Sequence, residues 1–293
     1  MPAPAPLIVV DAPSLMYRAF FALPTTITDG ADRPANALLG FANLVLQAVE
    51  EHAPRAVVLC WGAEAAHYRT DAWPAYHADR PPMPDELAEQ WGRAPELFAA
   101  FGWTSLDAED LEADDLLGTL ARVERGAGGR TLLFTGDRDM FQCADEATAI
   151  LYPAGRGTGG PEHIDADGVR ERYGIEPAQV PDFIALRGDP SDGIPGAKGI
   201  GAKGAGELLA AHGDLEALLA LAAEPGAVVR RQLTKRQAAS LTDQADQLRA
   251  FRDVATLRPV DVERPADAPL DREGAAAAAE ELGLQRLATR LRG

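Results

Sequence analysis

Acidic residues recur at positions where a folded chain could bring them together. Glu112, Asp114 and Asp115 open an apolar helical pattern, with Glu112 and Asp115 spaced for one helix face. The positive end of the helix dipole also favours acids in a first turn. Further carboxylates, however, follow predicted strands and turns: Asp11, Asp137, Asp139, Asp189 and Asp192. Because converging like charges repel and lose solvation, this pattern predicts a polynuclear metal site.

Short apolar segments alternate with helical patterns along the first half of the chain. The predicted strands cover residues 7–11, 56–61, 103–106, 130–135 and 148–151. Helical periodicity occurs at residues 35–49 and 83–98, and again after Glu112. This order predicts an α/β fold with a mostly parallel central sheet flanked by helices. The carboxyl ends of parallel strands share one edge, so Asp11 and the Asp137/Asp139 pair are expected to meet there.

The character of the chain changes after about residue 176, to short helices and glycine turns. Residues 187–204 are too rich in glycine for a helix or strand, and a helix is predicted at 205–212. A loop containing Gly199 and Gly201 can offer backbone N–H groups to a phosphate, with Lys198 and Lys203 beside it. A plain helix–turn–helix would explain the glycines alone. Residues 258–269 read as a connector, and residues 271–291 as a final helix or pair of helices.

Composition limits the class of protein. The net charge of −17 argues against nonspecific binding to polyanions, so any contact with nucleic acid depends on local basic clusters. The chain has only three lysines, all in its C-terminal third. Its two cysteines show no disulfide spacing. No signal sequence or membrane span is visible, so we expect a cytoplasmic protein without membrane contact.

Several motifs, in the right order, resemble the 5′-nuclease family of bacterial flap endonucleases and the 5′→3′ exonuclease domain of DNA polymerase I. They are Val-Val-Asp11, Glu-Ala-Asp-Asp115, Thr-Gly-Asp137-Arg-Asp139 and Gly-Asp189-Pro-Ser-Asp192-Gly-Ile-Pro195. The segment 196–203 resembles the family's helix–hairpin–helix. The resemblance implies a PIN-like nuclease core at 1–175, a helix–hairpin–helix subdomain at 176–262, and a connector with a helix at 263–293. We expect a stand-alone form.

The resemblance also implies a function and the residues that perform it. The expected activity is metal-dependent cleavage of DNA near free 5′ ends, flaps or nicks, which gives a 5′-phosphate and a 3′-hydroxyl. Two metal groups are implied, the first of Asp11, Glu112, Asp114 and Asp115, and the second of Asp137, Asp139, Asp189 and Asp192. Oxygen ligands suit Mg²⁺ or Mn²⁺. The hairpin is expected to grip duplex DNA, with K⁺ on its carbonyls. We expect a monomer, and a DNA polymerase is a further candidate partner.

An arch that admits single-stranded DNA is implied within residues 67–100. By resemblance Arg69 and Arg80 would meet phosphates, Tyr76 would stack on a base, and His77 stands where the family has a lysine. A hydrophobic cluster that holds the loop is the alternative for the aromatic residues. The family also places an aspartate where this chain has Gly62, and Glu64 is the nearest substitute. We therefore expect reduced or Mn²⁺-dependent activity rather than none.

Three rival functions remain at this point. A catalytically weakened paralogue that acts mainly as a DNA-structure binder would explain Gly62, although binding alone would not need Asp137, Asp139, Asp189 and Asp192. A PIN-like ribonuclease would leave the glycine hairpin without a role. An unrelated metal-dependent phosphatase would leave both the hairpin and the arch unexplained.

Overall fold

A mixed sheet forms the centre of the protein. The computed structural model describes residues 4–153, 160–224 and 226–293, and within them the strand order is β3-β2-β1-β4-β5-β6. The strands are β1 (Leu7–Asp11), β2 (Ala56–Trp61), β3 (Thr104–Asp107), β4 (Thr131–Phe134), β5 (Thr148–Tyr152) and β6 (Glu162–Ile164). Strands β1 to β5 are parallel, and β6 pairs antiparallel with β5. The strand β1 is therefore central, which places Asp11 in the middle of one sheet edge.

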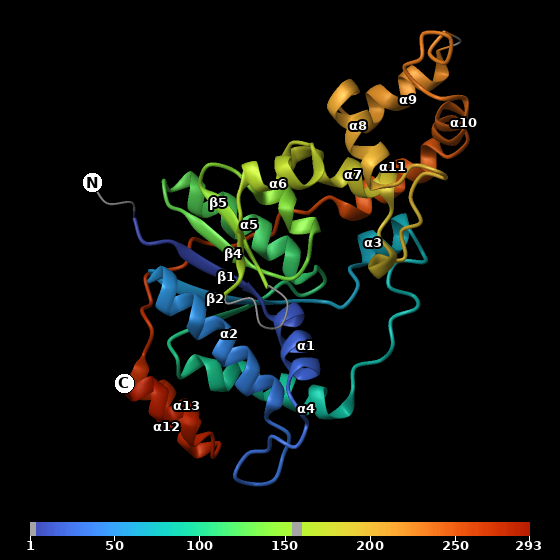
Figure 1. The fold of residues 1–293 in the computed structure, drawn as a ribbon. Coiled ribbons are helices and arrows are strands. Elements are labelled where there is room, and N and C mark those ends of the chain that lie inside the picture. Colours follow the sequence, from blue (N-terminus) through green and yellow to red (C-terminus); the bar gives the residue numbers. More distant parts are fainter. Residues whose placement is uncertain (1–3, 154–159, 225) are drawn as a thin grey trace.

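Two helical layers cover the sheet (Figure 1). Successive strand residues point to opposite faces, so Ile8 and Val10 enter one apolar layer and Leu7 and Val9 the other. The first layer contains α1 (Ala12–Ala22), α2 (Asn36–His52), α4 (Asp85–Ala99), α12 (Arg272–Glu281) and α13 (Gln285–Arg292). The second contains α5 (Ala113–Gly126), α6 (Ala166–Tyr173) and α7 (Val180–Arg187). Burial on both faces explains why these strands are continuous apolar segments.

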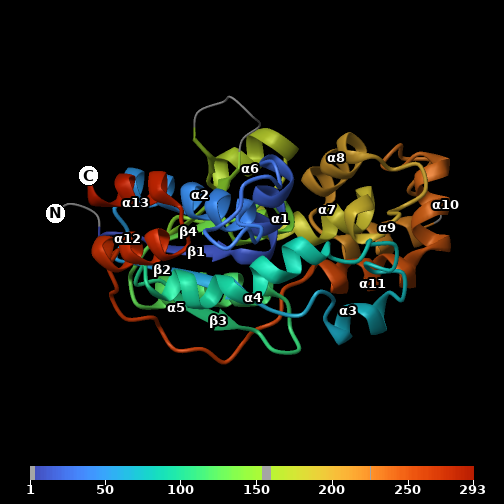
Figure 2. The same ribbon diagram turned by 90° about the horizontal axis from the view of Figure 1, so that it is seen from below.

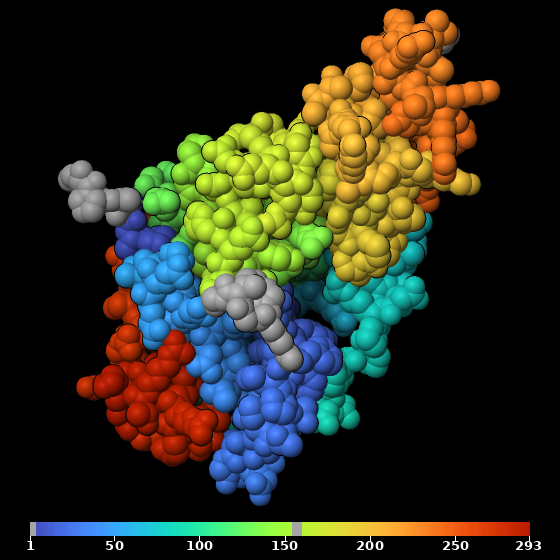
Figure 3. Space-filling view, in the orientation of Figure 1, coloured from blue at the N-terminus to red at the C-terminus, as the bar shows by residue number. Residues whose placement is uncertain are grey.

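A helical lobe extends from one end of the core, opposite α12 and α13 (Figures 2 and 3). Its helices are α8 (Ala202–His212), α9 (Leu215–Ala223), α10 (Lys235–Asp243) and α11 (Ala245–Ala255). The short helix α3 (His67–Ala72) packs against α11. Short 3₁₀ turns lie at η1 (Asp139–Cys143), η2 (Pro177–Gln179) and η3 (Pro190–Asp192). The lobe thus follows α7, next to the turns that carry the second group of predicted carboxylates.

A connector returns the chain from the lobe to the core. The backbone N–H of Arg258 donates to Asp115 Oδ1 at 2.6 Å, and that of Val260 donates to Thr119 Oγ1 at 3.0 Å. Farther along, the guanidinium of Arg264 pairs with the buried Glu124 of α5 at 2.9 Å. The connector is therefore fixed along α5 before the chain enters α12.

The predicted fold class is confirmed: a mostly parallel sheet flanked by helices, followed by a helical subdomain. The sequence analysis did not predict α1, α6 or β6. Helix α1 was missed because Asp11 ends β1 and also caps the helix, accepting a hydrogen bond from the Ser14 N–H at 3.0 Å. A strand that turns directly into a helix leaves no loop signal in the sequence. No described helix is both long and apolar enough to cross a bilayer.

The loop between α1 and α2 is organised by one buried carboxylate. Asp29 accepts hydrogen bonds from the N–H groups of Ala31 and Arg33, and it pairs with the side chains of Arg33 and Arg93. Burial raises the pKa of Asp29, but the hydrogen bonds from Arg33 and Ala31 and the charge of Arg93 outweigh it. The net result is a pKa of about 2, below the ordinary 3.8.

The Asp29→Asn variant should lose stability that depends on pH. A lowered pKa stabilises the fold above the unfolded pKa, so the variant should be less stable by about 2 kcal/mol near pH 6. That difference should vanish as the pH falls from about 4 to about 2, where the wild-type carboxylate also becomes protonated. Urea unfolding at several pH values measures both effects. Asp32→Asn, at an exposed position in the same loop, is the control; matching pH profiles for the two variants would contradict this account.

Candidate active site

A cleft of about 1000 Å³ lies at the edge of the sheet where β1 and β4 end. It collects all but one of the sequence-predicted carboxylates; those lining it are Asp11, Glu112, Asp114, Asp137, Asp139, Asp189 and Asp192. Asp115 is the exception among the eight. Acids that are far apart in the sequence therefore face one volume, as the strand-end argument predicted.

Asp11 is held at the centre of this edge. Its Oδ2 accepts a hydrogen bond from Thr135 Oγ1 at 2.6 Å, and its Oδ1 accepts the α1 capping bond from Ser14. Burial raises the pKa of Asp11, and the negative charge of Glu112 adds to that effect. The sequence analysis did not identify Thr135, although its place immediately after β4 and before Gly136-Asp137 was the available signal.

The first turn of α5 sends its carboxylates in two directions. Glu112 precedes the helix as its N-cap, and Asp115 turns back to accept the Glu112 N–H at 3.2 Å. Asp115 is fully buried and also accepts the hydroxyl of Tyr68 at 3.1 Å. Asp114 lines the cleft instead, and its pKa is raised by burial and by Asp137. Glu112 and Asp115 were predicted to share one helix face. Their positions are instead set by the capping box at the start of α5.

The turn after β4 supplies two acids whose pKa values are raised. Asp137 Oδ1 accepts the N–H of Asp139 at 2.9 Å, and the Asp137 N–H donates to Thr135 Oγ1 at 2.9 Å. Burial and the charge of Asp192 raise the pKa of Asp137 to about 7. The pKa of Asp139 is also raised, by burial and then by Asp137. Asp139 Oδ1 is buried without a hydrogen-bond partner.

Cationic side chains within the protein meet several of these acids. Arg69 Nη1 lies 2.5 Å from Glu112 Oε2, an ion pair outside hydrogen-bond alignment, and Arg187 Nη2 lies 2.7 Å from Asp189 Oδ2. As the side chains stand, no three described His, Cys, Asp or Glu residues are arranged to hold one ion. The donor set nevertheless fits a hard divalent cation, since it consists of buried or half-buried, mutually repelling oxygens, including the unpartnered Asp139 Oδ1.

The arch residues predicted to contact DNA divide into buried and accessible groups. Arg69 is 3% exposed, and Tyr76 is 6% exposed and donates to Glu112 Oε2 at 2.9 Å. Both side chains thus brace Glu112 as the structure stands, rather than presenting themselves to a base or phosphate. His77 and Arg80 lie on the wall of the cleft and reach Asp192. Trp73 packs edge-on against Phe251, the loop-holding role that was the alternative for the arch aromatics.

Gly62 has no room for a side chain. A Cβ at this position would lie 2.6 Å from the Leu111 carbonyl oxygen and 2.8 Å from the Ala113 nitrogen. The Ala63 N–H donates to the same carbonyl at 2.8 Å, so the backbone before α5 is fastened directly onto this loop. Two backbone segments therefore approach each other closely at Gly62 and leave no space for a carboxylate there. Glu64, the nearest substitute in the sequence, is exposed and lines the cleft.

An aspartate at position 62 should therefore destabilise the fold rather than complete the carboxylate set. Gly62→Asp and Gly62→Ala are both expected to lower stability by about 1–3 kcal/mol, because the backbone of residues 111–113 must move. Since that movement displaces Glu112, neither variant should bind Mn²⁺ more tightly than the wild type. Gly92→Ala, where a Cβ would meet nothing within 4 Å, is the matched control for urea unfolding. Tighter Mn²⁺ binding by Gly62→Asp in a calorimetric titration would show that the loop can accept the carboxylate.

The glycine hairpin leaves the end of the cleft and enters α8. Lys198, Gly199, Gly201 and Lys203 are all exposed. Gly199 has φ +85°, and the Arg236 guanidinium fills the space that a Cβ would occupy. Gln244 Oε1 accepts the Lys198 N–H at 2.8 Å, and Gln244 Nε2 donates to the Gly196 carbonyl at 3.4 Å. One side chain therefore ties the hairpin backbone to the start of α11.

Comparison with known proteins shows which family has this arrangement of sheet, cleft and hairpin. Residues 6–174 match the model "5′-3′ exonuclease, N-terminal resolvase-like domain", and residues 175–273 match "5′-3′ exonuclease, C-terminal SAM fold". The chain belongs to the 5′-3′ exonuclease family. The family predicted from the motifs is thus confirmed.

Relatives within the 5′-3′ exonuclease family include longer proteins. The chain is 39% identical over 213 residues to the thermostable DNA polymerase I of Thermus thermophilus, which covers 73% of this chain and 25% of that protein. It is 37% identical over 214 residues to DNA polymerase I of Mycobacterium bovis, which covers 73% of this chain and 24% of that protein. The chain therefore spans about a quarter of the length of these polymerases.

Solved structures share the fold of this 5′-3′ exonuclease family member at low sequence identity. The T5 D15 protein co-crystallised with metal ions matches with a TM-score of 0.69 at 15% identity, covering 97% of this chain and 96% of that one. The catalytic core of Rad2 in complex with DNA substrate matches with a TM-score of 0.65 at 17% identity, covering 98% and 92%. These likenesses establish the shared architecture.

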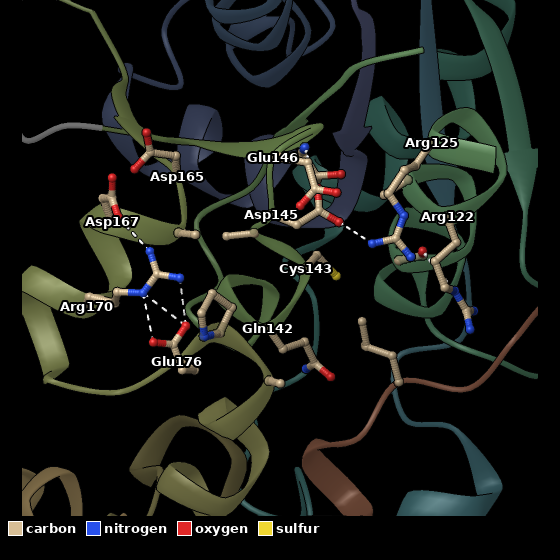
Figure 4. A pocket seen from close by; sticks show the side chains of 18 residues that line it. Arg122, Arg125, Gln142, Cys143, Asp145, Glu146, Asp165, Asp167, Arg170 and Glu176 are labelled. Atoms are coloured by element: carbon tan, nitrogen blue, oxygen red, sulfur yellow. Dashed lines mark hydrogen bonds and ion pairs between the residues drawn. The ribbon is translucent and has the colours of Figure 1, made fainter. Parts of the chain in front are cut away.

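A second pocket, of about 710 Å³, lies between α5 and α6 of this exonuclease fold (Figure 4). Its charged side chains are mostly paired with one another: Arg125 with Asp145, and Arg170 with Glu176 and Asp167. Burial raises the pKa of the Cys143 thiol in its wall to about 12, which makes the thiol a poor nucleophile. None of the eight predicted carboxylates lines this pocket, so the strand-edge cleft is the candidate active site.

Proposed function

We propose that this protein is a divalent-metal-dependent 5′→3′ exonuclease and flap endonuclease that hydrolyses DNA phosphodiesters near free 5′ ends, flaps or nicks. The observation that carries the proposal is the convergence of buried carboxylates on one cleft in a chain of the 5′-3′ exonuclease family. Hydrolysis would add water across a phosphodiester, leaving a 5′-phosphate and a 3′-hydroxyl.

The carboxylates of the cleft would hold the metal ions. Asp137, Asp139, Asp189 and Asp192 form the second proposed group, and Asp11, Glu112 and Asp114 form the first. Asp115 supports the first group by capping α5. Bound Mg²⁺ or Mn²⁺ would supply Lewis-acid stabilisation of charge on the phosphodiester. The metal ions co-crystallised with the T5 D15 protein support this choice of cofactor class.

The remaining side chains would position DNA. Arg80 and His77 offer N–H donors to phosphates at the cleft, and the exposed hairpin with Lys198 and Lys203 offers backbone N–H groups and charge to a duplex. Contacts of this kind carry no base information, so selection would be by DNA structure. K⁺ on hairpin carbonyls is part of the proposal, as are a monomeric state and a polymerase partner. The proposed polymerase partner is supported by the matches to DNA polymerase I proteins, which contain a region similar to this chain.

Aromatic residues beside the cleft would complete the DNA site. Phe21 of α1 lines the cleft and is 68% exposed, and its ring stacks on Tyr17 with centroids 6.5 Å apart. An exposed aromatic face at the edge of a phosphate-binding cleft suits stacking on a terminal base. The sequence analysis did not select these residues, because an aromatic pair at helical spacing is also typical of a core.

A 5′-end-labelled flap duplex tests the function directly. Incubation with Mg²⁺, Mn²⁺ or EDTA should give cleavage near the junction with either metal and none with EDTA. The duplex strand that remains at the junction should carry a 5′-phosphate. A DNA ligase should therefore join it to an adjacent 3′-hydroxyl. Tight flap binding without cleavage in either metal would replace the proposal with its alternative, a DNA-structure binder. The internal pairing of Glu112 and Asp192 with basic side chains is the observation that favours that alternative.

A further inference from the structure

Two basic side chains of one turn close on the same carboxylate oxygen at the mouth of the cleft. His77 Nε2 lies 3.1 Å from Asp192 Oδ1, and Arg80 Nη2 lies 3.2 Å from the same atom. His77 Nδ1 lies 2.8 Å from the Glu64 carbonyl oxygen. Asp192 Oδ1 is therefore occupied from within the protein, by the Arg80 guanidinium and by the His77 ring.

The turn that carries these side chains is anchored at both of its sides. Trp73 Nε1 donates to the Gly193 carbonyl at 2.9 Å, next to Asp192, and Tyr76 donates to Glu112. The ring of His77 stacks on that of Tyr76, with centroids 3.7 Å apart. His77 itself has φ +54°, a left-handed conformation that non-glycine residues rarely adopt. Its contacts thus hold His77 in a backbone conformation that it would not keep unaided.

The basic residues of the cleft differ in how readily they can leave. The side chains of Arg69 and His77 are 4% and 5% exposed, whereas that of Arg80 is 40% exposed and borders solvent. Arg80 can therefore move away from Asp192 on its own, whereas His77 can leave only when the turn that carries it shifts. Together these movements would uncover the oxygen that a divalent ion of the second group needs and would free both side chains to meet DNA phosphates.

We propose that His77 and Arg80 form a latch on Asp192, which divalent ions must open and which then passes its two basic side chains to the DNA backbone. The inference rests on the proposed function, because it concerns the same cleft. It predicts that the latch weakens metal binding in the free protein and strengthens DNA binding in the complex. The two effects have opposite signs, and a general loss of structure would weaken both.

Calorimetric titration with Mn²⁺, without DNA, tests the first effect. The variants are His77→Gln, Arg80→Gln and the double variant, which replaces both basic side chains by amides. Arg290→Gln, which breaks a half-exposed pair with Glu50 far from the cleft, is the matched control. The double variant should bind Mn²⁺ about 3- to 30-fold more tightly, because the competing closed state is removed. Unchanged, weaker or unmeasurable Mn²⁺ binding in the double variant would overturn the latch.

Flap-duplex binding in saturating Ca²⁺, a hard divalent ion that should open the latch, tests the second effect. The double variant should bind the flap more weakly than both the wild type and Arg290→Gln, under conditions in which urea unfolding shows all three proteins to be folded. Undiminished DNA affinity would overturn the transfer of the side chains. Failure of the latch is distinguishable from failure of the nuclease assignment, because neither titration requires cleavage. A latch confirmed in a protein that cleaves no DNA would overturn the assignment alone.

Discussion

Replacing Asp137 by asparagine is expected to lower kcat for flap cleavage by about 10³-fold, since bound cations supply several kcal/mol of charge stabilisation in such sites. Asp137 sits where both carboxylate groups meet: burial raises its pKa most, followed by Asp192, and Asp11 and Asp189 contribute in the same direction. An amide keeps the shape of the side chain but cannot supply the negative charge that holds a cation.

Measuring the stability of the Asp137→Asn variant distinguishes a loss of catalysis from misfolding. The pKa of Asp137 is raised to about 7, so ionisation of this group costs stability as the pH rises through that value. The metal-free Asp137→Asn protein should therefore be at least as stable as the wild type at pH 8. Single-turnover cleavage and urea unfolding give the two readouts, with Glu146→Gln at an exposed site outside the cleft as the control. Full cleavage by Asp137→Asn would remove this residue from the metal site.

The second large effect is expected on folding. Arg69→Ala should lower the free energy of unfolding by about 3–5 kcal/mol, because it leaves buried carboxylates without their cation. Arg69 lies 2.5 Å from Glu112 and 3.6 Å from Asp115, and its Nε donates to the Val254 carbonyl of α11 at 3.0 Å. One guanidinium thus joins α3, the start of α5 and the lobe.

An exposed arginine pair provides the comparison for that measurement. Arg290→Ala breaks the contact with Glu50, a pair in which both side chains are more than one third exposed. This variant should lower the free energy of unfolding by less than about 1 kcal/mol. Urea unfolding of both variants at one pH is sufficient. An equal, small loss in the two variants would mean that Glu112 and Asp115 find other partners when Arg69 is absent.

The elements that carry the carboxylates could be predicted because their signals are local. Strands β1, β2 and β4 are buried on both faces, so each is a continuous apolar segment that ends on or near an acid. The parallel alternation then placed Asp11 and Asp137 on one edge without any knowledge of side-chain contacts. Helix α1 and strand β6 lacked such signals. Helix α1 begins directly after Asp11, the last residue of β1, and β6 is only three residues long.

The hydrogen bonds and ion pairs of the site could not be predicted, because they depend on contacts between distant segments. Asp114 and Asp115 are adjacent in the sequence, yet one lines the cleft while the other accepts N–H groups of Glu112 and Arg258. Arg69 was assigned to DNA from its position in a motif. Its burial follows from the packing of α3 against α11, which no local pattern encodes.

The return of the chain to the core after the lobe bears on how the protein is made. Helices α12 and α13 join the apolar layer that α1, α2 and α4 form on one face of the sheet, so part of that layer stays open to water until residues 272–292 have left the ribosome. The lobe from α8 to α11 precedes them and can form first. During synthesis the earliest helices therefore remain partly uncovered until the last ones form, and a nascent chain stalled before α12 should attract chaperones that recognise exposed apolar helix surfaces.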